Sequence, residues 1–225
     1  MKVSQRGTSS ASVSSDGYYT CDRYQVQNNS FGAYTIIQET LTSGNAYEDG
    51  FQKAWRIDCT TADASPSAGS YLLFSQRLEG QDVKCFKKGT PNAETYTLAF
   101  WVKSNKTGVG QINLRDAPNT RMCSGTYTIS SANTWEKKVI NYAADTTGVT
   151  PSTSANCLEV EIWLDSGTDW SSGATPTAWE ALTSPDRNAS GALAIADSDA
   201  NDWAITGVQL EVGTYSSSTI PPFQH

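Results

Sequence analysis

The chain has 225 residues, of which 38% are hydrophobic and 17% charged, and it carries 7 Trp and 10 Tyr. This composition favours an all-β domain over a helical bundle, which needs more Ala, Leu, Glu and Lys. The formal net charge is −7, and no cluster of basic residues is longer than the pairs Lys87-Lys88 and Lys137-Lys138. These features argue against a nucleic-acid partner and against a polybasic membrane anchor.

The sequence shows no targeting or membrane segment. The start, MKVSQRGTSSASVSS, lacks the apolar stretch of a signal peptide. The longest apolar runs, such as LAFWV, are too short to cross a bilayer. We therefore expect a soluble protein with no membrane insertion.

Five cysteines, an odd number, are spread along the chain without a Cys-x-x-Cys pair. With the single His225 they cannot complete a zinc site. We expect them to be small, mostly buried apolar side chains in a protein made in a reducing cytoplasm. At least one thiol must be free or paired with another chain. The cysteines are Cys21, Cys59, Cys85, Cys123 and Cys157.

Apolar and polar residues alternate in many short runs that are separated by turn residues, which predicts strands. The clearest run is 157–165, where Leu158, Val160 and Ile162 should face inward. The run 96–104 is apolar on both faces, as expected for a central strand. The ten predicted strands are 22–27, 32–39, 51–59, 70–78, 96–104, 110–116, 122–129, 135–142, 157–165 and 203–212.

In the last predicted strand, Ala204, Thr206, Val208, Leu210 and Val212 should share one face, with a bulge at Gly207. Four other segments interrupt the pattern of strands: an N-terminal arm (1–17), one short helix (80–88), a long loop (166–202) and an extended C-terminal coil (214–225). Together they predict one domain over 1–225, an all-β antiparallel β-sandwich of jelly-roll type with about ten strands.

Several motifs, among them LEGQD, FWVKS, TGVQLEVG and PPFQH, resemble a domain of tailed-phage virion proteins, especially tail fibres. Such domains are similar to jelly-roll carbohydrate-binding modules. The resemblance covers essentially the whole chain and implies a location on the particle surface, after synthesis in the host bacterial cytoplasm. It also implies a homotrimer, contacts with other virion proteins and a host surface glycan as ligand. The family usually has Glu where this chain has Gln224, and related chains extend beyond both ends. We therefore expect a short natural variant or a domain excised from a longer protein.

Long loops are uncommon unless they bind something or pack against a partner, and this one carries two tryptophans. Trp163 alternates with Glu159 and Glu161 and should face away from the core. The candidate ligand-binding residues are Trp163, Trp170, Trp179 and Arg187. Packing or a subunit interface is the competing explanation for them. We expect Trp55, Trp101 and Trp203 in the core.

Metal binding and catalysis have weaker support. Asp197, Asp199, Asn201 and Asp202 offer the oxygen ligands of a structural calcium, but a polar loop is the favoured interpretation. The acid pairs Glu159 with Glu161 and Asp197 with Asp199 are best explained as a solvated face rather than as a glycosidase pair. His225 lies in a terminal coil, where we expect it to mark the end of the domain. We therefore expect no enzyme and no required cofactor.

The sequence thus favours a tail-fibre-type module for host attachment through surface carbohydrate. A head-decoration or other structural virion protein is the alternative. A glycan-degrading tailspike enzyme is a weaker one.

Overall fold

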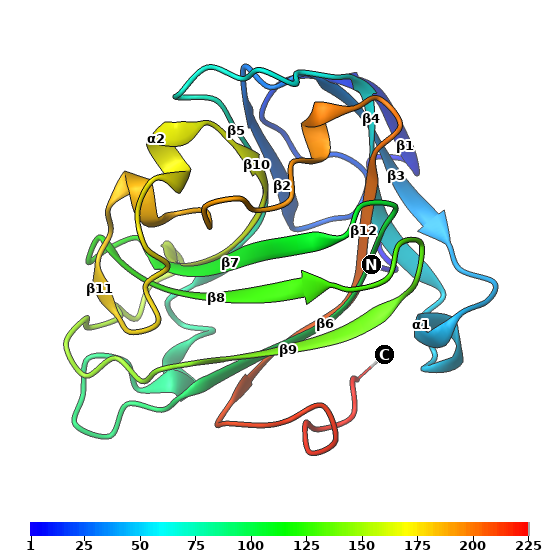
Figure 1. Ribbon diagram of the computed structural model, residues 1–225. Helices are drawn as coiled ribbons and strands as arrows, with labels where there is room; N and C mark the ends of the chain where they lie inside the picture. Colours follow the sequence, from blue (N-terminus) through cyan, green and yellow to red (C-terminus); the bar gives the residue numbers. More distant parts are fainter. Residues whose placement is uncertain (225) are drawn as a thin grey trace.

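The computed structural model describes residues 1–224, which form twelve strands in two facing antiparallel sheets (Figure 1). Sheet A has the order β1 (Ser9–Val13), β3 (Ala33–Thr40), β4 (Lys53–Thr61), β12 (Asp202–Val212), β6 (Tyr96–Ser104) and β9 (Glu136–Tyr142). Sheet B has the order β11 (Glu180–Ala181), β8 (Arg121–Ile129), β7 (Gly108–Asp116), β10 (Asn156–Ser166), β5 (Tyr71–Glu79) and β2 (Tyr24–Asn29).

Strand pairing identifies the topology as a jelly roll. The antiparallel pairs β7–β8, β6–β9, β5–β10 and β4–β12 are nested around the β7–β8 turn, as in one long hairpin. That hairpin is rolled so that its pairs alternate between the sheets, which gives the two four-stranded groups β4-β12-β6-β9 and β5-β10-β7-β8. The predicted fold class is confirmed. The strands β1, β2, β3 and β11 extend the edges.

All ten predicted strands are present, with ends shifted by a few residues. The sequence missed β1, which is mostly exposed and contains a bulge, and β11, which has only two residues. The predicted short helix 80–88 is present but shorter, as a 3₁₀ helix over Lys84–Phe86. Lys87 then adopts a left-handed conformation that ends the turn. Val83 and Phe86 are buried, as their spacing indicated.

Helices are few and short. Residues 1–224 contain α1 (Asn45–Glu48), α2 (Thr168–Ser171) and the 3₁₀ turns Lys84–Phe86, Ser184–Asp186 and Ile195–Asp197. No helix in this part of the chain has the length and apolar character needed to span a membrane.

Aromatic rings fill the space between the sheets. The Trp55 ring stacks on Phe74 with centroids 3.8 Å apart and meets Trp203 edge-on at 6.3 Å. Trp55 and Trp203 are fully buried, as predicted. Trp101 does not belong to this core: it is half-buried on the outer face of sheet A and donates its indole N–H to Asp49. The run 96–104 is apolar on both faces, so its sequence does not show which face meets the other sheet.

In β12 the alternation of inward-facing and outward-facing residues shifts by one position at Gly207. This residue has φ +61° and lies within a register shift between Thr206 and Gln209. A Cβ at Gly207 would lie 2.6 Å from the Phe51 ring, so a side chain has no room there. The predicted bulge is confirmed, but the predicted common face is wrong. Trp203 and Ile205 point inward before the bulge, and after it Val208, Leu210 and Val212 pack against the same core. Ala204 and Thr206 lie on the outer face.

Within residues 1–224 the five cysteines are free thiols. Cys21, Cys59, Cys123 and Cys157 are buried as expected, whereas Cys85 is exposed. Gln224 lies at the end of the C-terminal coil, and the expectation for His225 falls outside the described residues.

Candidate functional site

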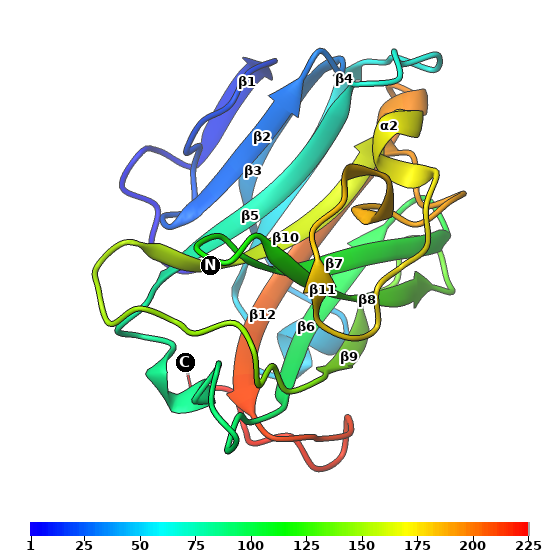
Figure 2. The same cartoon turned by 90° about the vertical axis from the view of Figure 1, so that its left-hand side faces the viewer.

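The long loop 166–202 folds back onto the outer face of sheet B (Figure 2). Gln111 Nε2 donates to the carbonyl of Asp186 at 2.9 Å, and Asn113 Nδ2 donates to that of Arg187 at 2.8 Å. Backbone bonds from Leu182 to Thr120 and from Leu193 to Val109 hold the loop at other points. These contacts show what the two tryptophans of the loop could not reveal by themselves, namely that the loop packs on its own domain.

Three of the four predicted site residues meet under this loop. The guanidinium carbon of Arg187 lies 5.0 Å from the Trp163 ring centroid and 5.2 Å from that of Trp170. The two indole rings are 5.8 Å apart, and Tyr71 meets Trp170 edge-on at 5.3 Å. Such cation–π contacts favour a fixed guanidinium. Trp163 faces away from the core as predicted, but the loop buries it, so only Tyr71, Trp170 and Arg187 remain partly accessible.

The acid pair on β10 is not a solvated face, contrary to the sequence interpretation. The Glu159 and Glu161 side chains are each 1% exposed. Arg187 Nη2 binds Glu161 at 2.7 Å, and the Trp163 indole N–H donates to the same carboxylate at 3.3 Å. Asn113 Nδ2 adds a third donor at 3.5 Å. These donors explain how a carboxylate can be buried on a sheet face. Asp197 and Asp199 are exposed, as expected.

Glu159 lies at the centre of a cross-strand row. Register places Arg77 of β5 and Arg115 of β7 directly opposite Glu159, one on each side. Arg77 Nε donates to Glu159 Oε1 at 3.1 Å, and Arg115 Nη1 donates to Oε2 at 2.8 Å. Gln27 adds a bond to Oε1 at 3.2 Å. Neither arginine was among the predicted site residues, because only the strand register brings them to Glu159.

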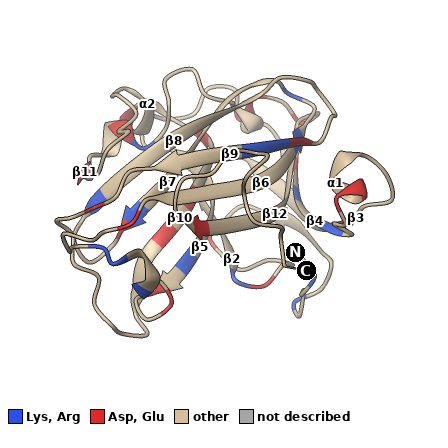
Figure 3. Cartoon of the chain, turned by 90° about the horizontal axis from the view of Figure 1, so that it is seen from below, with Lys and Arg blue, Asp and Glu red and all other residues tan. Residues whose placement is uncertain are grey.

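The row Arg77–Glu159–Arg115 is the uncovered part of this face. The arginine side chains are 44% and 34% exposed, although the carboxylate between them is buried. Figure 3 shows the distribution of charged residues over the strands. The outer face of sheet B therefore combines an open guanidinium row with the partly accessible aromatic residues Tyr71 and Trp170 at its other end.

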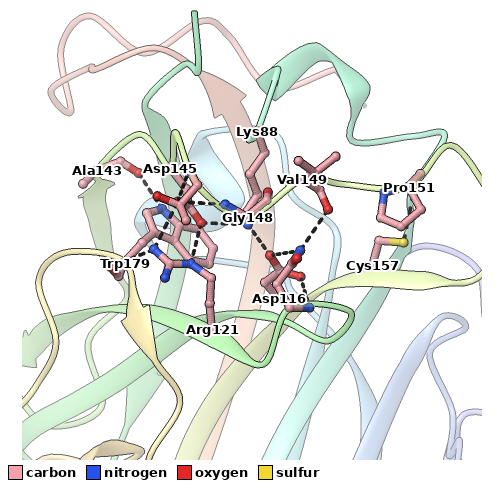
Figure 4. A network of polar contacts seen from close by, with 12 residues as sticks. Lys88, Asp116, Arg121, Ala143, Asp145, Gly148, Val149, Pro151, Cys157 and Trp179 are labelled. Carbon is pink, nitrogen blue, oxygen red and sulfur yellow. Dashed lines mark hydrogen bonds and ion pairs between the residues drawn. The ribbon is translucent and has the colours of Figure 1, made fainter. Parts of the chain in front are cut away.

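Trp179 lies elsewhere, in the core, where its ring packs over a buried ion cluster (Figure 4). Lys88 Nζ lies 4.6 Å from that ring and pairs with Asp116 and with Asp145, the latter at 2.8 Å. Arg121 binds both oxygens of Asp145 at 3.0 and 3.1 Å. Burial by itself would raise the pKa of Asp145, but hydrogen bonds from Arg121 and Lys88 outweigh it and hold that pKa well below its usual range.

Two of the three carboxylates considered for calcium, those of Asp197 and Asp202, are used by other partners. Asp197 pairs with Lys106 and accepts from Asn201 Nδ2 at 2.6 Å. Asp202 binds Arg56 Nη2 at 3.0 Å. Over residues 1–224 no group of three His, Cys, Asp or Glu side chains is arranged to hold a metal ion. The residues thus do not fit a structural calcium site, and a polar loop describes them better.

No family model and no curated protein matches the chain. Among solved structures it is similar to the enzymatically active domain of bacteriophage CBA120 tailspike protein 4, with 13% identity and a TM-score of 0.45, over 85% of this chain and 19% of that one. A putative sugar binding protein from Bacteroides thetaiotaomicron has 15% identity and a TM-score of 0.43, over 92% and 95% of the two chains.

A third similar structure is the N-terminal CBM22-1–CBM22-2 tandem domain of Xyn10C from Paenibacillus barcinonensis. It has 11% identity and a TM-score of 0.43, over 86% of this chain and 47% of that one. The chain thus spans about a fifth of the length of the tailspike and about half that of the tandem domain.

Proposed function

We propose that this chain is a non-enzymatic carbohydrate-binding domain of a phage particle, which attaches to host surface glycans through the outer face of sheet B. The observation that carries the proposal is the open row Arg77–Glu159–Arg115, which shares this face with the partly accessible residues Tyr71 and Trp170. The virion context and the homotrimer rest on the sequence resemblance. Three such sites on one trimer would multiply a weak single-site affinity.

The face offers the two kinds of contact that sugars need. Arg77 and Tyr71 are both on β5, six residues apart, which is about 20 Å at the usual rise of a strand. An extended oligosaccharide that follows β5 could stack a ring on an aromatic side chain and place hydroxyl groups at the guanidinium row. Few well-placed polar groups next to aromatic surface are typical of ligand sites.

The acids of this face support binding rather than hydrolysis. Glu159 and Glu161 are buried, and donors from neighbouring side chains occupy their oxygens. A glycosidase acid must touch the glycosidic oxygen of the substrate. Both carboxylates lie beneath the side chains that bind them, and we therefore propose recognition without cleavage.

Binding of the purified chain to polysaccharide from susceptible host cells tests the proposal. We expect retention on immobilised polysaccharide, weakened by Trp170→Ala and by Arg115→Ala. Lys84→Ala, a change of an exposed lysine in the Lys84–Phe86 turn, is the matched control and should bind like the parent. If the chain binds no host polysaccharide and immunogold labelling finds it only on the head, the structural decoration alternative replaces this proposal.

A further inference from the structure

The row on sheet B has two cations for one buried anion. Arg77 and Arg115 approach the Glu159 carboxylate from neighbouring strands, at 3.1 and 2.8 Å. Glu159 is 1% exposed, whereas the guanidinium groups reach solvent. The carboxylate therefore lies beneath the arginines and orients them, because each guanidinium is planar and binds with a fixed geometry.

Part of each guanidinium remains available. Arg77 uses Nε, and Arg115 uses Nη1 with Nε at 3.8 Å from Glu161. Within residues 1–224, neither Nη of Arg77 nor Nη2 of Arg115 has a hydrogen-bond partner. A guanidinium that binds through one edge leaves its other edge free to form bidentate hydrogen bonds with an oxyanion of a ligand.

The ion-pair cluster around Glu159 and Glu161 contains more cations than acids, although the molecule as a whole is acidic. Arg77, Arg115 and Arg187 form ion pairs with Glu159 and Glu161, so this ion-pair cluster holds three cations and two acids. By contrast, Arg56 is surrounded by Glu39, Asp58 and Asp202, and the cluster around Lys88 is balanced. Among the ion-pair clusters formed by residues 1–224, cations outnumber acids only on this face, in a chain with net charge −7.

From these observations we infer that the ligand of this face is an anionic glycan, whose carboxylate, sulfate or phosphate group binds between Arg77 and Arg115. This inference rests on the proposed function and specifies its ligand class. The sugar rings then extend along β5 toward Tyr71 and Trp170. Asp16, whose charge also acts on Arg77, accepts a hydrogen bond from the backbone N–H of Asn28 at 2.8 Å.

Binding to matched polymers tests the charge requirement. The probes are polygalacturonate and its carboxyl-reduced form, dextran sulfate and dextran, and a teichoic acid with phosphodiester links, each titrated by calorimetry at low and at physiological salt. We expect at least one anionic polymer to bind about tenfold more tightly than its neutral counterpart, and the difference to shrink as salt is raised. The anionic polymer that binds most tightly shows whether the preferred group is a carboxylate, a sulfate or a phosphate.

Arginine variants test the geometry. Arg77→Lys/Arg115→Lys keeps both charges but loses the planar fork, so we expect about a tenfold loss of affinity for the anionic polymer. Arg77→Gln/Arg115→Gln/Glu159→Gln removes the cations and the buried charge together, so it should keep its fold by circular dichroism and lose this binding. Lys84→Gln should change nothing.

Equal binding of a neutral polymer and its anionic form, or full affinity in the lysine variant, would overturn the anionic site and leave carbohydrate binding intact. If the protein binds no glycan at all, host polysaccharide included, both the anionic site and the proposed carbohydrate-binding function are overturned.

Discussion

The buried ion cluster around Lys88 and the row around Glu159 use the same chemistry with opposite exposure. In both regions a carboxylate that is 1% exposed pairs with a cation at hydrogen-bond distance. Lys88 is itself 3% exposed, whereas Arg77 and Arg115 are 44% and 34% exposed. The first region can therefore only hold the fold together, while the second can also meet a ligand. The two regions therefore differ in whether other residues cover the cation of the ion pair.

The topology of the fold explains why Lys88 is covered and the two arginines are not. Asp116 ends β7 and Arg121 begins β8, so the β7–β8 turn places both at one end of the sandwich. Residues 143–149 and Trp179 then close over Lys88, with Gly148 accepting from its Nζ at 2.9 Å. The row around Glu159 lies on an open sheet face, where the loop 166–202 reaches Trp163 but leaves both arginines exposed.

The largest effect should come from Lys88→Met. Removing the ammonium leaves Asp116 buried without its cation, which costs about 3–5 kcal/mol of unfolding free energy. Urea denaturation measures it. The double change Lys88→Met/Asp116→Asn should recover much of the loss, and the exposed control Lys84→Met should stay within about 0.5 kcal/mol of the parent. A small loss in the single variant would show that the cluster is not tightly sealed.

Asp165 extends this comparison to a buried carboxyl group that has no cation as ion-pair partner in the described part of the chain. Asp165 is buried and accepts backbone N–H groups of Ala196 and Ser166, each at 2.8 Å, and no ion pair within residues 1–224 includes it. Burial is the main cause that raises its pKa to about 7. The folded state thus keeps a proton that the unfolded chain loses near pH 4, so stability falls as pH rises from about 4 to 7.

Asp165→Asn should abolish this contribution. Relative to the parent, the variant should gain roughly 2–4 kcal/mol as pH rises from 4 to 7, because each pKa unit corresponds to about 1.4 kcal/mol. Denaturation curves of both proteins at several pH values measure the difference. A difference that does not change with pH would contradict the raised pKa.

The smallest stability effect should come from Glu159→Gln. Its two arginines are exposed and stay hydrated when the charge is removed, so we expect a loss of about 1–2 kcal/mol. The same urea titration measures it, with Lys84→Gln as the control. A loss as large as that of Lys88→Met would mean that the row is also a sealed structural element.

Strand positions could be predicted because a half-buried strand shows its alternation in the sequence, as β10 does. Alternation also gave the outward direction of Trp163. It could not show that a loop beginning at Ser166 returns to bury that ring, because the return depends on contacts between distant segments. Arg77 and Arg115 are 38 positions apart and each is far from Glu159 in the sequence, so only the register makes them neighbours. Trp101 was misplaced because a strand that is apolar on both faces gives no direction.

Met1 and Phe223 line one cavity of about 200 Å³, together with Phe51 and Thr206 on the outer face of sheet A. The shared cavity places the two ends of the described chain close together. Neighbouring ends permit insertion of the whole domain into a loop of another protein without forcing that loop apart.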